Sequence, residues 1–280
     1  MGAQLNFRSG PQAGASDAAD LKRWGGTGLA RQSAVMAARS LRRLLSPRML
    51  LISLVQPLLL LTLFSQMFRG IAEVAGFAPG ISYVDYLVPA ILVTTAAQTA
   101  MWTGTGIADE MRSGILPRLR RLPVNMAAVV IGRNVHDMVR IALQLAAVTA
   151  VAAGALGYDP PGGVAGTLAA AATAVLFGGG LSAVFIALGT WLRNPELLQM
   201  VGVALIFPLM FVSTAFVPLH QQPPWLAALA AANPITYAIE SSRGLALADG
   251  RGEYLLALLV VCVALGGLGC WSGAVLIRRP

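Results

Sequence analysis

Charged side chains are scarce in this chain of 280 residues, and lysine is almost absent. Only 11% of the residues are charged, against about 25% in soluble domains, whereas 56% are hydrophobic. The mean hydropathy of +0.70 excludes a large soluble core and indicates a polytopic membrane protein. Lys22 is the only lysine, so arginine supplies nearly all of the positive charge behind a net charge of +8. Most arginines lie in loops on one side, as membrane topology requires, so we predict no nucleic-acid partner.

Histidine, cysteine and nucleotide-binding motifs are also scarce. His136 and His220 are the only histidines, which excludes a histidine-rich metal site. Cys262 and Cys270 would lie about 12 Å apart along a helix, too far for a disulfide. The sequence contains no G-x-x-x-x-G-K-[ST], H-E-x-x-H or G-x-S-x-G motif. We therefore predict no catalytic residues, no metal site and no ATP hydrolysis by this chain itself.

Six apolar stretches reach the roughly 20 residues that cross a bilayer. They predict an all-α polytopic membrane protein with six transmembrane helices, at about 49–68, 87–107, 124–156, 164–192, 197–217 and 254–277. Residues 1–28 have the composition of a disordered cytoplasmic tail. Basic and apolar residues over 29–45 follow helical spacing, which predicts an N-terminal amphipathic helix lying along the inner leaflet.

Arginine and lysine are concentrated on one side of these spans. Eight lie before the first span and four between spans two and three, whereas the loop after the first span holds only Arg69. Basic residues in short loops stay in the cytoplasm. We therefore predict that both termini and the loop between spans two and three are cytoplasmic.

The chain is organised around a charged island at residues 107–123, IADEMRSGILPRLRRLP, which lies between two apolar spans. Two interpretations remain open at this point. The island is either a topogenic loop that only fixes orientation, or a handle for a cytoplasmic partner.

Charged residues also fall inside span three, at Arg133, His136, Asp137 and Arg140. A charge at the bilayer centre costs about 2.5–3.5 kcal/mol on insertion scales, so such groups usually face protein or water. Helical spacing would let Arg133 pair with Asp137, and Asp137 with Arg140, on one helix face. Alternatively, the span begins later and this cluster lies at the inner headgroups.

The stretch before the last span is apolar but interrupted by proline. Two short runs, 225–232 and 235–247, are separated by Asn233-Pro234, which suits the end of one helix and the start of another. We predict an external re-entrant helical pair at about 222–247. The alternative is an amphipathic surface helix anchored by Trp225.

Three motifs carry a resemblance to a known family. The first is EMRSGIL at 110–116, with Leu119 and Pro123 behind it, and the second is GR at 132–133 with Asp137. The third and most specific runs from FVP at 216–218 through PWL to NPIT and then Arg243. Over residues 30–280 these motifs resemble ABC-2 type permeases, the membrane subunits of bacterial ABC exporters. The daunorubicin-resistance-like branch is the most similar.

The resemblance implies a transmembrane domain over 29–280 in a bacterial plasma membrane, surrounded by lipid. Its partners would be a dimeric ABC ATPase and a second permease subunit, identical or homologous. ATP and magnesium would bind to the ATPase, and this chain would hold no cofactor. The loop at about 108–122 would be a coupling helix that enters a groove of the ATPase, although Met111 and Pro117 depart from the family pattern. Its contact residues would be Glu110, Arg112, Gly114, Leu116, Leu119 and Arg121.

The function implied is ATP-driven export of a hydrophobic drug or lipid-like metabolite. Six spans are too few to enclose a roomy path, so the path should lie between two permeases. Candidate lining residues are Thr95, Gln98, Thr99, Trp102, Phe207, Met210 and Phe211, with lipid contact or core packing as the alternative for span five. Candidate residues of an external gate are Pro224, Trp225, Asn233, Pro234, Glu240 and Arg243. Three other functions stay open: export of polysaccharide or another envelope glycoconjugate, a scaffold that docks an ATPase without transport, and, more distantly, an intramembrane enzyme.

Overall fold

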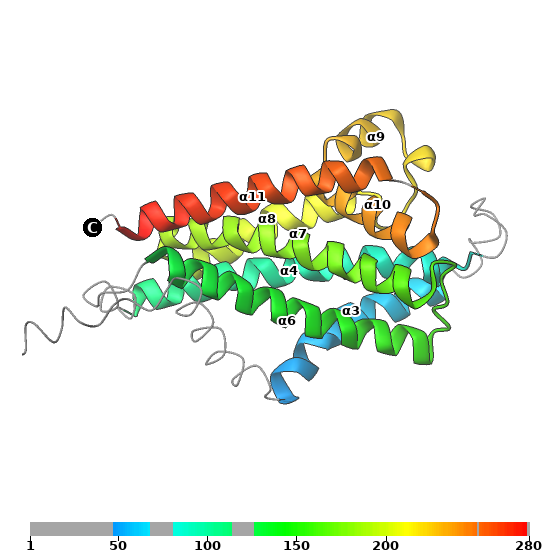
Figure 1. Cartoon of the computed structure of the whole chain (residues 1–280), viewed down its shortest axis with the longest axis horizontal. Coiled ribbons are helices and arrows are strands. Elements are labelled where there is room, and N and C mark those ends of the chain that lie inside the picture. Colours follow the sequence, from blue (N-terminus) through cyan, green and yellow to red (C-terminus); the bar gives the residue numbers. More distant parts are fainter. Residues whose placement is uncertain (1–46, 68–80, 114–125, 251, 279–280) are drawn as a thin grey trace, which may run out of the picture.

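The computed structural model describes residues 47–67, 81–113, 126–250 and 252–278 (Figure 1). Within these ranges the chain forms eight α-helices, one short 3-10 helix and no strand, which confirms the all-α fold there. The elements are α3 (Pro47–Met67), α4 (Tyr83–Arg112), α6 (Met126–Ala155), α7 (Gly163–Leu192), α8 (Pro195–Val212), η1 (Leu219–Gln221), α9 (Pro224–Ala231), α10 (Pro234–Leu247) and α11 (Gly252–Arg278). The N-terminal tail, the helix predicted at 29–45 and most of the charged island lie outside the described residues.

Five of these helices, α4, α6, α7, α8 and α11, are long and apolar enough to cross a membrane. Helix α3 adds a shorter apolar stretch, Ile52–Met67. The chain is therefore a multi-pass membrane protein with five or six spans. Every predicted span coincides with one of these helices, and most ends agree within a few residues.

Two of the differences at helix ends come from local polar contacts. Helix α4 begins at Tyr83 and not near 87, because Ser82 and Asp85 form a capping box in which each side chain bonds the other residue's backbone N–H at 3.1 Å. Helix α8 ends at Val212 and not at 217, because the backbone of Ser213 is extended. The Ser213 hydroxyl then accepts a hydrogen bond from the Ala215 N–H at 3.2 Å.

Helices α4 and α7 form the centre of the bundle, with α3 and α6 on one side and α8 and α11 on the other (Figure 1). Glycine permits this close packing, since a Cβ on Gly189 would lie 2.5 Å from the Gly104 carbonyl oxygen. On the other side of α7, a Cβ on Gly269 of α11 would collide with the backbone at Ala183. Small residues thus let three helix backbones approach one another.

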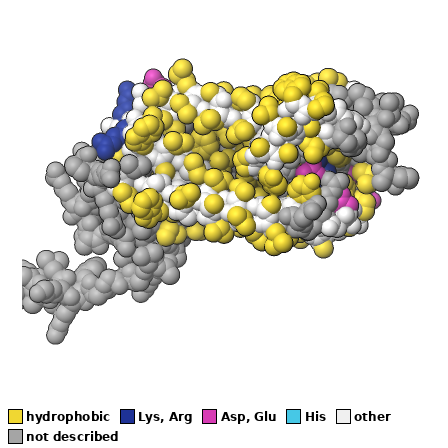
Figure 2. Space-filling view, turned by 90° about the horizontal axis from the view of Figure 1, so that it is seen from above, with side chains coloured by type: hydrophobic (Ala, Val, Ile, Leu, Met, Phe, Trp, Pro, Cys, Tyr) yellow, Lys and Arg dark blue, Asp and Glu magenta, His cyan; other side chains and the backbone are white. Residues whose placement is uncertain are grey.

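The bundle has two chemically different ends. Figure 2 shows most of the dark-blue Lys and Arg side chains at one end, with magenta beside them, and most of the magenta acidic side chains toward the other end, with a yellow apolar surface between the two ends. At the basic end, Arg112 closes α4 and Arg193 caps α7. An apolar belt between two polar ends is what a bilayer requires.

Candidate functional site

The segment predicted to couple to an ATPase, residues 108–122, begins inside a span helix. Residues 108–112 continue α4 without a break, and Ser113 caps it by donating its N–H to the Asp109 carbonyl at 2.8 Å. We predicted a separate helix from residue 108. The helical hydrogen bonds of α4 instead continue past the apolar stretch as far as Arg112. Four of the predicted contact residues, Gly114, Leu116, Leu119 and Arg121, lie outside the described residues. Arg112 is 63% exposed and lies 3.7 Å from Glu196.

Glu110 faces inward, toward the next helix. Its Oε1 atom lies 2.5 Å from Nη1 of Arg133 on α6. The Glu110 side chain is 36% exposed and the Arg133 side chain is 24% exposed. Arg133 therefore pairs across helices with Glu110, whereas helical spacing had offered Asp137 on α6 as a possible partner.

Asp137 and Arg140 face protein in the half of α6 that begins at Met126. Asp137 is buried, with Oδ1 3.5 Å from His136 Nδ1, and its Oδ2 has no hydrogen-bond partner. Arg140 donates from Nη2 to the Thr99 carbonyl oxygen on α4 at 3.2 Å. Arg133 and Arg140 thus lie against α4 and Asp137 is buried, so these three charges avoid the energetic cost of facing lipid.

The predicted polar face of α4 divides between the interior and the surface. Thr99 donates its hydroxyl to Gln144 Oε1 at 3.0 Å, and Gln144 donates to the Ser53 carbonyl oxygen at 2.9 Å. This chain of hydrogen bonds joins α4, α6 and α3 inside one subunit. Thr95 is buried as well, whereas Trp102 is 50% exposed.

The predicted residues on α8 divide in the same way. Met210 is buried and its sulfur lies 3.6 Å from the Gln98 amide nitrogen. Phe207 and Phe211 remain open to the surface, and their rings lie 6.3 Å apart. Trp102, Phe207 and Phe211 are therefore the predicted lining residues that a second subunit or a cargo molecule can reach.

The two helices predicted at 222–247 are present as α9 and α10. Pro224 begins α9, and Trp225 on it is largely exposed. Asn233 caps α10 by accepting the Ile235 N–H at 3.0 Å and ties it to α8 by donating to the Leu209 carbonyl at 2.6 Å. Pro234 occupies the first turn of α10, where its missing N–H is not needed. Helix α10 is buried against α4, α7 and α11.

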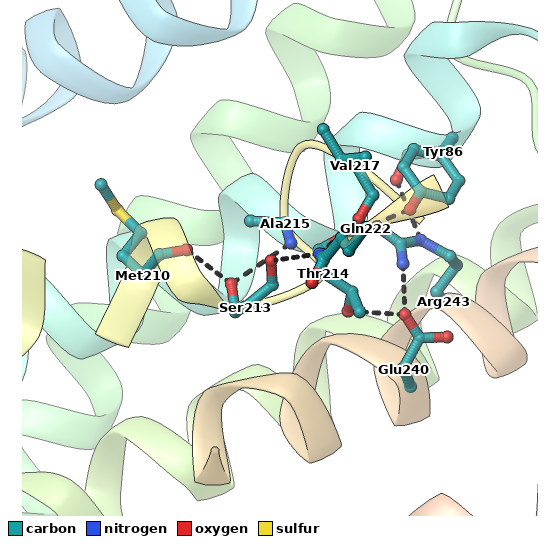
Figure 3. Close-up of polar contacts among 9 residues, drawn as sticks. All are labelled: Tyr86, Met210, Ser213, Thr214, Ala215, Val217, Gln222, Glu240 and Arg243. Atoms are coloured by element: carbon teal, nitrogen blue, oxygen red, sulfur yellow. Dashed lines mark hydrogen bonds and ion pairs between the residues drawn. The ribbon is translucent and has the colours of Figure 1, made fainter. Parts of the chain in front are cut away.

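Glu240 and Arg243 form a buried ion pair on α10 (Figure 3). Arg243 is 1% exposed and donates to Glu240 Oε1 at 2.5 Å, to the Thr214 carbonyl at 3.1 Å and to the Tyr86 carbonyl at 3.2 Å. Its guanidinium carbon also lies 3.5 Å from the centre of the Tyr86 ring. The pair therefore braces α10 against α4 and the turn after α8. Sequence reasoning found Glu240 and Arg243 but missed Tyr86 and Thr214, which are remote in sequence.

Asp85 is a second polar residue that sequence reasoning missed. Its Oδ1 accepts the Asp159 N–H at 2.9 Å, so the start of α4 is tied to the turn between α6 and α7. The S-x-x-D spacing of its capping box was the available signal. In the same turn, burial raises the pKa of Tyr158, a hydrogen bond with Thr167 lowers it, and the nearby Asp85 carboxyl raises it further. Among the described residues no group of three His, Cys, Asp or Glu side chains could hold a metal ion.

Several apolar spans, a basic end and charges that face protein define a multi-pass membrane protein. Residues 31–247 match the ABC-2 type transporter family, and the chain belongs to it. Members of this family are membrane permeases without a nucleotide-binding domain, and the ATPase is a separate protein. This chain is therefore the membrane permease component of such a transporter.

Three relatives illustrate the similarity. The daunorubicin resistance ABC transporter permease protein DrrB1 of Streptomyces coeruleorubidus is 30% identical over 222 residues, which cover 79% of this chain and 75% of that protein. The putative transport permease ycf38 of Porphyra purpurea is 32% identical over 198 residues, or 70% of this chain and 67% of ycf38. The probable doxorubicin resistance permease DrrC of Mycobacterium tuberculosis is 24% identical over 216 residues, or 75% and 76% of the two chains.

Proposed function

We propose that this chain is the permease subunit of an ATP-driven exporter that moves a hydrophobic drug or lipid-like metabolite out of the cytoplasm or inner leaflet. The observation that carries the proposal is the 30% identity to a daunorubicin resistance permease over 79% of the chain. The similarity to a probable doxorubicin resistance permease adds support. The protein works in a bacterial plasma membrane with six spans, α3 included, and with both termini in the cytoplasm.

The partners are an ABC ATPase, which binds ATP and magnesium, and a second permease subunit. The coupling segment, residues 108–122, meets the ATPase at the basic end of the bundle. The exposure of Arg112 beside the last turn of α4 supports this docking. The coupling segment acts through the predicted set Glu110, Arg112, Gly114, Leu116, Leu119 and Arg121.

The cargo path lies between two permeases and ends at an outer gate formed by α9 and α10. Trp102, Phe207 and Phe211 support the path, because they are the aromatic members of the predicted set that remain exposed. For the gate, Asn233-Pro234 separates an exposed helix from a buried one, and Glu240 with Arg243 anchors the buried helix. The gate thus combines an exposed outer helix with a buried inner one.

The experiment is reconstitution of the permease with its ATPase in vesicles, followed by measurement of daunorubicin transport and of ATP hydrolysis with and without daunorubicin. An exporter of hydrophobic drugs transports the compound and hydrolyses ATP faster when it is present. A scaffold binds the ATPase but shows neither effect. Stimulation by a lipid-linked glycan and not by daunorubicin would assign the chain to glycoconjugate export instead.

A further inference from the structure

We propose that Arg133 is a positioning residue that clasps Glu110 at the base of the coupling segment and makes α4 and α6 move as one body. The inference rests on the proposed function. It gives Glu110 an internal role, as one half of a clasp between two helices, in place of a docking charge aimed at the ATPase.

The clasp joins the two helices that flank the coupling segment. Glu110 lies in the last turn of α4, which ends at Arg112, and Arg133 lies about two turns into α6, which begins at Met126. The 2.5 Å separation between Arg133 Nη1 and Glu110 Oε1 therefore closes the base of the segment between these helices. A force on the coupling segment is transmitted to α4 and α6 together as long as the ion pair between Glu110 and Arg133 is intact.

Gly106 provides the space in which the Arg133 guanidinium lies. A Cβ atom on Gly106 would be 2.6 Å from Arg133 Nη2, closer than any real contact. Gly106 and Glu110 are four residues apart on α4 and so share one face of the helix. The guanidinium thus lies over the glycine and reaches the carboxylate one turn further along, and a side chain at 106 would make the flexible end of the Arg133 side chain shift.

The local charges explain why this pair is more than a surface contact. Arg133 and Glu110 are 24% and 36% exposed, whereas Arg112 and Glu196 at the same end are 63% and 82% exposed. Partly desolvated pairs interact more strongly than exposed ones. Arg133 Nε has no hydrogen-bond partner, so loss of Glu110 would leave a half-buried cation poorly compensated.

A charge-swap series in the reconstituted complex tests the clasp. Glu110→Arg and Arg133→Glu alone are each expected to lower daunorubicin-stimulated ATP hydrolysis about tenfold, while ATPase pull-down persists. The double swap Glu110→Arg/Arg133→Glu restores most of the stimulation, because the pair re-forms with reversed polarity. Arg193→Glu, an equal charge reversal at an exposed position of the same end, leaves stimulation unchanged. Failure of the double swap to recover any stimulation would overturn the clasp, since a Glu110 that contacts the ATPase directly cannot be rescued from α6.

Gly106→Ala tests the same clasp without changing a charge. The new methyl group makes the end of the Arg133 side chain shift, which weakens its alignment with Glu110. Alanine stabilises the helix by up to about 1 kcal/mol relative to glycine, so insertion and thermal stability should not fall. Stimulation is expected to drop, whereas the control Gly154→Ala on α6, whose Cβ meets nothing within 4 Å, keeps the wild-type value.

Melting temperatures of the purified permease test the pair without cargo or ATPase. The double swap should have a higher melting temperature than either single reversal. If its melting temperature does not recover, the clasp is wrong, whatever the cargo. If wild-type is stimulated by daunorubicin while both single reversals keep full stimulation, the clasp is wrong and the proposed function stands. A wild-type complex without transport or stimulation contradicts the proposed function, and the melting series then decides the clasp alone.

Discussion

Arg243 and Glu240 form an ion pair that is almost fully removed from solvent, although they lie near one end of a membrane bundle. Their partners come from three parts of the chain: α10 itself, the start of α4 through Tyr86, and the turn after α8 through Thr214. The pair therefore decides where α10 lies, and α10 carries the inner half of the proposed outer gate.

Removing one partner of this pair should be far more damaging than removing both. Arg243→Met leaves the buried Glu240 carboxylate without its guanidinium partner, and breaking a buried ion pair in this way costs about 3–5 kcal/mol of folding stability. The double variant Arg243→Met/Glu240→Leu should recover much of that loss, because apolar residues often replace a buried pair at little cost. Melting temperatures in detergent measure both effects. A double variant less stable than Arg243→Met would contradict the account, and the exposed Trp225→Ala serves as a control with little expected change.

Asn233→Ala/Pro234→Ala tests the break between α9 and α10. The substitution removes the cap on α10, worth about 1 kcal/mol, together with the hydrogen bond to the Leu209 carbonyl. Without proline, α9 and α10 can merge into one helix. Drug export by reconstituted vesicles should fall while ATPase pull-down stays intact. Leu229→Ala, an exposed change on α9, provides the control, and normal export by the double variant would reduce the stretch to a surface loop.

The positions of the helices could be predicted from the sequence because apolar length alone identifies a span. Their ends could not, because single polar contacts decide them: Ser82 with Asp85 extends α4, and Ser213 stops α8. Helical spacing suggested Asp137 as the partner of Arg133, yet Glu110 on α4 is the actual partner. The choice depends on how α4 and α6 are rotated against each other and on the space that Gly106 leaves, and neither quantity can be read from one sequence.

The outer ion pair illustrates the same limit. The i,i+3 spacing of Glu240 and Arg243 was visible on a predicted helix. Tyr86 and Thr214, which accept the remaining guanidinium hydrogen bonds through their carbonyls, lie 157 and 29 residues away from Arg243. Backbone acceptors carry no residue-type signal, so only the folded chain identifies them.

Cysteine labelling tests the topology. In a variant without Cys262 and Cys270, single cysteines at 159 and 221 should react with an impermeant reagent added outside the cell, and one at 118 should react only after permeabilisation. The exposure of Asp159 and Gln221 makes both positions suitable. The physical reason is the excess of arginine on the side of the charged island. Labelling of 118 from outside would overturn the orientation.

Two measurements, folding stability and the response of ATP hydrolysis to cargo, distinguish predicted lining residues that pack inside the subunit from those that contact cargo. Thr99→Val breaks the hydrogen bond to Gln144 inside the subunit, and it should cost about 1 kcal/mol of stability. Phe211→Ala removes an aromatic ring that is 58% exposed, so folding should change little. If the ring faces cargo, the daunorubicin concentration that half-maximally stimulates ATP hydrolysis should rise about threefold to tenfold, as expected for one lost apolar contact of about 1 kcal/mol.

The maximal stimulated rate should stay the same in Phe211→Ala, because the coupling segment and the Glu110–Arg133 pair are untouched. Leu205→Ala, at an exposed apolar position on the same helix, is the matched control for simple loss of lipid contact. Equal shifts in Phe211→Ala and Leu205→Ala would mean that the ring contacts lipid. A shift confined to Phe211→Ala would mean that cargo passes the surface of α8, since only a ligand distinguishes two side chains that the bilayer solvates alike.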